Sequence, residues 1–118
     1  MYRIVIAALL GIMMASNGAS AHAILIKSEP MAGATVPAGT LAMSFSYNSR
    51  IDQARSRLTL IRPDRSQATL KIAPSALPDV LETTAEVSAP GAYVVRWQVL
   101  AVDGHITRGD VPFTVAGH

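Results

Sequence analysis

Asp103 and His105 are two neighbouring residues of this chain whose side chains could together bind a metal ion. The chain contains three histidines and no cysteine, so imidazole, carboxylate, thioether or backbone nitrogen would have to supply the ligands. The pair lies in the run Val102-Asp103-Gly104-His105. If the chain is extended there, both side chains project to the same side and can reach one ion. The alternative is an Asp-Gly turn with a solvated histidine.

His22 becomes a chelating residue if the chain is cut immediately before it. The α-amine and the ring Nδ1 of an N-terminal histidine can bind one ion together, which no internal histidine can do. This pair suits Cu(II), which prefers tetragonal nitrogen and oxygen ligands, and Asp103 and His105 would complete a set of three nitrogens and one oxygen. The alternative is a histidine left by chance at a frayed terminus. His118 is expected to be a solvated end, although a ligand role for it stays open.

Residues 1–21 have the features of a secretory signal. Arg3 supplies a positive charge, residues 4–15 form an apolar run, and Ala19-Ser20-Ala21 fits the small-x-small rule for cleavage after Ala21. The apolar run is too short to span a membrane, which needs about 20 residues. The sequence therefore predicts a cleaved signal over residues 1–21 and a mature chain of residues 22–118 without a membrane span. A retained anchor or a cut elsewhere is the alternative.

The composition is that of one small globular domain. A length of 118 residues leaves room for one domain. The formal net charge of +2 comes from ten basic and eight acidic residues, which are scattered, so no basic stripe for nucleic acid is visible. Eight glycines and seven prolines in turn-rich spacers argue against a helical bundle.

From Ala23 onward, short alternations of apolar and polar residues predict an all-β domain. About seven strands suit a sandwich of two sheets. Residues 48–57 and 74–78 are expected to be loops, and a helical turn could form in either. The expected strands are residues 24–28, 41–46, 58–61, 69–72, 83–87, 93–100 and 111–115.

The same alternation predicts which side chains meet in the core. The chain contains one tryptophan, and Trp97 is expected at the centre of the core because it lies on the apolar face of the longest strand. Three stripes are expected to face inward: Tyr93, Val95, Trp97 and Val99; Leu41, Met43, Phe45 and Tyr47; and Val111, Phe113 and Val115.

Two segments carry a family resemblance. One is the start His22-Ala23 with Ser28-Glu29-Pro30, Gly33-Ala34 and Phe45-Ser46, and the other is the later run Gly91, Tyr93, Val95, Trp97, Val99, Asp103, Gly104, His105, Gly109, Phe113 and Val115. Together they resemble the CopC family of periplasmic copper-resistance proteins over nearly all of residues 22–118. The resemblance implies an immunoglobulin-like (cupredoxin-like Greek-key) β-sandwich.

The resemblance also implies a ligand set and a partner. One Cu(II) ion per chain would be bound by the amine and imidazole of His22, the carboxylate of Asp103 and the imidazole of His105. The implied partner is a CopD-type inner-membrane copper permease, to which such proteins are thought to pass the ion.

This chain departs from the family pattern in its methionines. Some family members carry a Met-rich loop that forms a second, Cu(I) site, because thioethers select the monovalent ion. After residues 1–21, only Met31 and Met43 remain, and Met43 belongs to a core stripe. A single Cu(II) site is therefore expected. Ala101 and Ile106 stand where the family often has Ser and Pro, which leaves the ligands intact but puts in doubt a supporting hydrogen bond from residue 101.

The sequence favours a non-enzymatic function. We expect a monomeric periplasmic carrier or buffer of copper that acts in copper homeostasis or resistance. The rival is a copper-dependent enzyme of the lytic polysaccharide monooxygenase type, which also binds copper through an N-terminal histidine and a second histidine. The short domain, the single tryptophan on the core face and the equatorial Asp103 count against that rival. A metal-free adhesion or scaffold sandwich is the remaining alternative.

Overall fold

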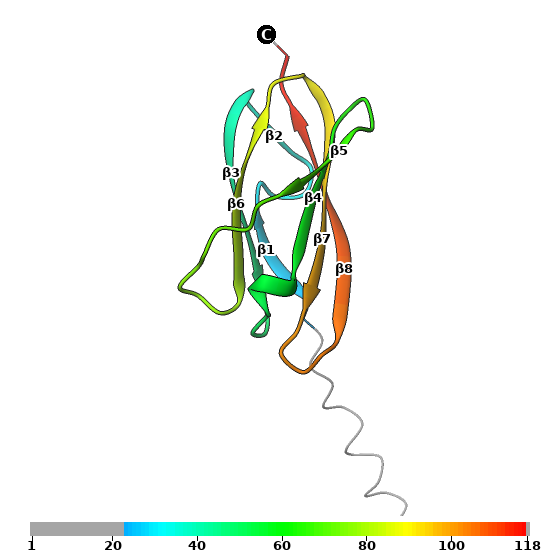
Figure 1. The fold of residues 1–118 in the computed structure, drawn as a ribbon. Helices are drawn as coiled ribbons and strands as arrows, with labels where there is room; N and C mark the ends of the chain where they lie inside the picture. Colours follow the sequence, from blue (N-terminus) through cyan, green and yellow to red (C-terminus); the bar gives the residue numbers. More distant parts are fainter. Residues whose placement is uncertain (1–22, 118) are drawn as a thin grey trace, which may run out of the picture.

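Two β-sheets face each other across an apolar core (Figure 1). The computed structural model describes residues 23–117, and the predicted signal, residues 1–21, lies outside them. The two all-β layers confirm the predicted immunoglobulin-like β-sandwich. The first sheet has the order β1 (Leu25–Glu29), β3 (Gly39–Tyr47), β6 (Val80–Val87), and the second has the order β2 (Ala34–Val36), β8 (Ile106–Val115), β7 (Gly91–Leu100), β4 (Arg57–Ile61), β5 (Gln67–Leu70).

The core contains the side chains that the alternation predicted. The β7 stripe Tyr93, Val95, Trp97 and Val99 is buried, as are Val111, Phe113 and Val115 of β8. The third stripe differs at one position, because Leu41 is half-buried and packs against the edge of the core, whereas Met43, Phe45 and Tyr47 are buried.

Trp97 lies against the backbone of Gly109, its cross-strand partner on β8. A Cβ atom at Gly109 would lie 2.4 Å from Cζ2 of Trp97, which is closer than non-bonded carbon atoms can approach. The absence of a side chain at residue 109 therefore makes room for the indole. Tyr47 meets the same indole from the opposite sheet, edge to face, with ring centroids 5.3 Å apart.

The structure contains a strand that the sequence did not predict, and it extends others. Strand β2 spans only three residues and pairs in parallel with β8, so it is too short to produce a visible alternation. Strand β8 begins at Ile106, whereas Val111 was predicted, because Gly109 resembles a turn residue in the sequence but is needed inside the strand beneath Trp97. Strand β6 also begins earlier than predicted, at Val80.

The two expected loops differ in structure. The segment after β3 contains a short 3-10 turn, η3 (Gln53–Arg55), which is capped by the side chain of Asp52. The segment between β5 and β6 contains no helical turn and forms a single bridge between Ala73 and Glu82. Among residues 23–117, no helix has the length and apolar character that a membrane crossing requires.

We expect Trp97→Ala to lower the free energy of unfolding by about 3 to 5 kcal/mol, because it removes the largest aromatic side chain from the core and leaves a cavity. Denaturant unfolding followed by circular dichroism measures this change. A denaturation midpoint that barely moves would contradict the position of Trp97 in the core.

Gly109→Ala tests the same contact from the neighbouring strand. The added methyl group collides with the six-membered ring of Trp97, so we expect a loss of about 1 to 3 kcal/mol from overpacking. The loss should be much smaller in a Trp97→Phe background, because phenylalanine lacks the indole that crowds a side chain at residue 109. Equal losses in both backgrounds would show that the indole does not limit the side chain at residue 109.

Candidate metal centre

The turn between β7 and β8 carries Asp103 and His105. The N–H of Gly104 donates to the carbonyl oxygen of Ala101 (2.9 Å), and the N–H of Ala101 donates to that of His105 (2.8 Å). Gly104 has a φ of +95°, a conformation that glycine adopts without strain. These bonds reverse the chain, so the extended conformation considered for this segment is wrong and the Asp-Gly turn is correct.

The turn places the carboxylate of Asp103 against the imidazole of His105. The backbone N–H of His105 donates to Oδ1 of Asp103 (3.1 Å). Nδ1 of His105 lies 3.0 Å from Oδ2 of the same carboxylate, and the His105 side chain is 54% exposed. The two predicted residues therefore do meet, but through the geometry of the turn and not through strand alternation.

This contact determines how the pair can act on a metal ion. When Nδ1 of a neutral imidazole carries the proton, the lone pair is on Nε2. A carboxylate that accepts a hydrogen bond from one ring nitrogen orients the ring and makes the other nitrogen a better ligand. A carboxylate also has more lone pairs than one such bond uses. Asp103 can thus orient His105 and has the chemistry to act as a ligand itself.

The described chain begins at the same end of the sandwich as this turn (Figure 1). Ala23, the first described residue, is fully buried in the core. The N–H of Ile24 donates to Oδ1 of Asn48 (2.8 Å), and the N–H of Asn48 donates to the carbonyl oxygen of Ile24 (3.0 Å). The start of the domain is therefore held in place by the segment that follows β3.

That segment, residues 48–52, also holds the β7–β8 turn. Ile51 forms an antiparallel bridge with Ala101. The N–H of Asp52 donates to the carbonyl oxygen of Leu100 (2.8 Å). One loop thus connects the start of the described chain to the turn that carries Asp103 and His105.

The other two histidines, His22 and His118, lie outside the described residues. The described chain ends at the opposite end of the sandwich from the turn, where the N–H of Ala116 donates to the carbonyl oxygen of Val36 (2.9 Å) (Figure 1). Within residues 23–117, no group of three or more His, Cys, Asp or Glu side chains could hold a metal ion. The described part of the chain therefore supplies two of the predicted donors, the side chains of Asp103 and His105.

Buried polar atoms are a feature that the sequence analysis missed. Burial raises the pKa of the Tyr47 phenol well above its ordinary value, because the phenolate would lose its hydration. The position of Tyr47 in an apolar stripe of the sequence did not indicate that its hydroxyl is buried. Four buried side-chain atoms have no hydrogen-bond partner within the described chain: Tyr47 Oη, Ser49 Oγ, Trp97 Nε1 and Thr107 Oγ1.

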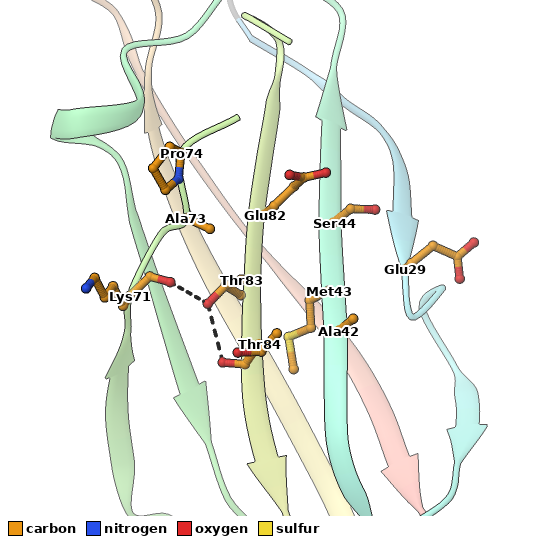
Figure 2. A pocket seen from close by; sticks show the side chains of 10 residues that line it. All are labelled: Glu29, Ala42, Met43, Ser44, Lys71, Ala73, Pro74, Glu82, Thr83 and Thr84. Carbon is orange, nitrogen blue, oxygen red and sulfur yellow. Dashed lines mark hydrogen bonds between the residues drawn. The ribbon is translucent and has the colours of Figure 1, made fainter. Parts of the chain in front are cut away.

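An open pocket of about 680 Å³ lies on the three-stranded sheet and the segment after β5 (Figure 2). The hydroxyl of Thr83 donates to the carbonyl oxygen of Lys71 (2.6 Å), which fastens that segment to β6. Glu29 and Glu82 contribute two carboxylates, but neither Asp103 nor His105 lines the pocket. The pocket is therefore separate from the candidate metal centre.

Comparison with known proteins gives consistent matches. The family model of the CopC domain matches residues 25–116. Copper resistance protein C of Xanthomonas campestris pv. juglandis is 29% identical over 109 residues, with 86% of each chain covered. Protein YobA of Escherichia coli strain K12 is 29% identical over 100 residues, covering 80% of this chain and 79% of YobA.

Two solved structures resemble the fold closely. The crystal structure of CopC from Methylosinus trichosporium OB3b matches with a TM-score of 0.73 and 28% identity, covering 82% of this chain and 96% of that one. PcoC from Escherichia coli, described as a methionine rich copper resistance protein, matches with a TM-score of 0.63 and 26% identity, covering 81% of this chain and all of that one.

We expect Gly104→Ala to lower the free energy of unfolding by about 1 to 2 kcal/mol, because a side chain is strained at the positive φ of this residue. No neighbouring atom lies within 4 Å of the added Cβ, so the backbone conformation alone causes the loss. Thermal or denaturant unfolding measures it. Gly117→Ala is the matched control, because that glycine has no positive φ; equal effects would contradict the turn conformation of Gly104.

Proposed function

This chain belongs to the CopC domain family, and on that premise we propose that it is a periplasmic copper-binding protein. It binds one Cu(II) ion through an N-terminal histidine chelate and carries or buffers that ion. Its role lies in copper homeostasis or resistance, consistent with the names of its relatives copper resistance protein C and PcoC.

The contact between Asp103 and His105 carries this proposal. The two side chains meet in a turn at the surface, and residues 48–52 connect that turn to Ala23 and Ile24. Consecutive Cα atoms are about 3.8 Å apart across a trans peptide. Ala23 lies at the same end of the sandwich as the turn, which supports a ligand set built from the chain start and the turn.

Cleavage after Ala21 would complete the donor set. It would make His22 the first residue, so that its α-amine and imidazole could bind the same ion as Asp103 and His105. Three nitrogens and one carboxylate oxygen are the hard and borderline ligands that Cu(II) accepts in a tetragonal arrangement.

The methionines support a preference for Cu(II) over Cu(I). Met43 is 3% exposed in the core, whereas Met31 lies in the connection from β1 to β2 and is 64% exposed. They cannot form the thioether cluster that would select Cu(I). PcoC is described as methionine rich, and residues 22–118 of this chain contain only these two methionines.

A carrier fits the surface of the domain better than an oxidative enzyme does. Within residues 23–117, every aromatic side chain is buried: Phe45, Tyr47, Tyr93, Trp97 and Phe113. Such a surface offers no aromatic platform for a polysaccharide. We propose that a CopD-type inner-membrane permease receives the ion, and the exposure of His105 would allow another protein's ligands to reach it.

We expect one extra residue ahead of His22 to weaken Cu(II) binding strongly. The added residue converts the α-amine of His22 into an amide, whose nitrogen can bind a metal only after it loses its proton. The amine–imidazole chelate of His22 is therefore lost, while every side chain is unchanged. A competition titration against a Cu(II) chelator compares the signal-processed protein with the extended one. Equal affinities would rule out the N-terminal chelate.

Side-chain variants separate the remaining roles in the same titration. His105→Ala removes an imidazole ligand and should weaken binding. Asp103→Asn keeps an oxygen that can accept the backbone N–H of His105 but removes the negative charge, so it should weaken binding if the carboxylate acts as a ligand. Asp64→Asn, at a distant turn, is the matched control and should leave the affinity unchanged.

Acidification should release the ion, because amine and imidazole nitrogens bind copper only when unprotonated.

We expect Cu(II) to raise the thermal stability of the signal-processed protein. The ligands come from distant parts of the sequence, so the ion can join them only in the folded state. At a free copper concentration 100 times the dissociation constant, the gain is about 2.7 kcal/mol if the unfolded chain binds weakly. Calorimetry measures the melting temperature, and an unchanged value for the processed protein would contradict a site built from the chain start and the turn.

A further inference from the structure

Charged side chains are divided unequally between the outer faces of the two sheets. All three glutamates of the described chain, Glu29, Glu82 and Glu86, project from the three-stranded sheet, where Glu29 and Glu82 flank Ser44. Arginine residues project instead from the five-stranded sheet, on strands β4, β7 and β8. The three-stranded sheet thus has an acidic face, on which the three glutamates outnumber Lys27 and Lys71. The opposite face is basic, because Arg57, Arg96 and Arg108 outnumber Asp110 there.

The arginines of the basic face are held in two neighbouring cross-strand rows. In the first row, Gln98 lies between Arg57 and Arg108, and Nε of Arg108 donates to Oε1 of Gln98 (2.8 Å). In the second row, Arg96 forms two hydrogen bonds with Asp110 (2.9 and 3.2 Å). Within residues 23–117, Arg57 and Arg108 take part in no ion pair, so their positive charge is available to a partner.

Exposed apolar side chains border these rows at the end of the molecule that carries the β7–β8 turn. Ile106 pairs with Leu100, two residues along the strands from the pair of Gln98 and Arg108, and its exposed fraction is 52%. Val102, within the turn, is 69% exposed. An apolar tip beside a row of cations is the arrangement by which proteins bind to the surface of an anionic membrane.

We propose that the basic face and its apolar tip, Val102 and Ile106, dock on an anionic phospholipid surface. Arginine guanidinium groups bind phosphate oxygens in a bidentate manner, while the two aliphatic side chains enter the headgroup region. The acidic face is repelled by such a surface, so the charge division fixes the orientation. The inference does not require copper, and with the proposed function it places the copper-binding turn beside the membrane in which a permease would lie.

Vesicle co-sedimentation of the signal-processed protein in the presence of EDTA tests this inference. Vesicles that contain phosphatidylglycerol should bind the protein, whereas pure phosphatidylcholine vesicles should not, and added salt should release it. Because the measurement uses metal-free protein, its result is independent of the copper titration. Absence of binding to phosphatidylglycerol vesicles at low salt would overturn the inference.

Two matched double variants locate the binding surface. Arg57→Gln with Arg108→Gln should weaken vesicle binding by about 25-fold, since each cation at an anionic membrane contributes about a fivefold factor. Lys27→Gln with Lys71→Gln removes the same charge outside the basic face and should have little effect. Equal weakening in both variants would overturn the assignment to the basic face, because it would show a response to net charge alone.

A second comparison tests the apolar tip. Ile106→Thr should weaken vesicle binding, whereas Met31→Thr, which changes an even more exposed apolar residue between β1 and β2, should not. Circular dichroism and melting temperature verify that all variants fold. Binding to soluble polyglutamate but not to phosphatidylglycerol vesicles would overturn the lipid assignment in favour of an acidic protein partner.

Discussion

The contact between the indole of Trp97 and the backbone of Gly109 fixes the pairing of β7 with β8. A shift of one residue would move every side chain of a strand to the other face of its sheet. The same pairing that buries Trp97 therefore turns Arg96 and Arg108 toward solvent. It also sets the position at which the hairpin must turn, and thus where Asp103 and His105 stand.

Residues 48–52 add the second constraint, because they join parts of the chain that lie far apart in the sequence. They bind the start of the domain through Ile24 and the β7–β8 turn through Ile51 and Asp52. These contacts hold Ala23 and Ile24, at the start of the described chain, and the β7–β8 turn at one end of the sandwich.

The burial of the aromatic side chains leaves charged and polar residues on the outer faces of the two sheets. The aromatic side chains of the described residues all lie between the sheets, and the strands present their alternate residues outward. On the five-stranded sheet these residues include Arg57, Arg96 and Arg108, and on the three-stranded sheet they include Glu29 and Glu82. A small sandwich can in this way separate the turn that carries Asp103 and His105, a basic face and an acidic face without further elements.

Alternation along single strands was sufficient to determine the sheet class, the inward stripes and the central position of Trp97, because the direction of a side chain in a strand depends only on local backbone geometry. The Asp-Gly-His run identified Asp103 and His105 as a candidate pair, but it left open an extended strand that joins them or a turn with a solvated histidine. Only the three-dimensional structure decided between an extended strand and a turn at these residues. The tertiary structure also determined the position of β2, which depends on pairing with β8. It explained why a glycine, Gly109, occurs inside a strand. It also connected Ala23 to the turn through residues 48–52. The last three features rest on contacts between strands or segments that are separate in the sequence, and no local periodicity records such contacts.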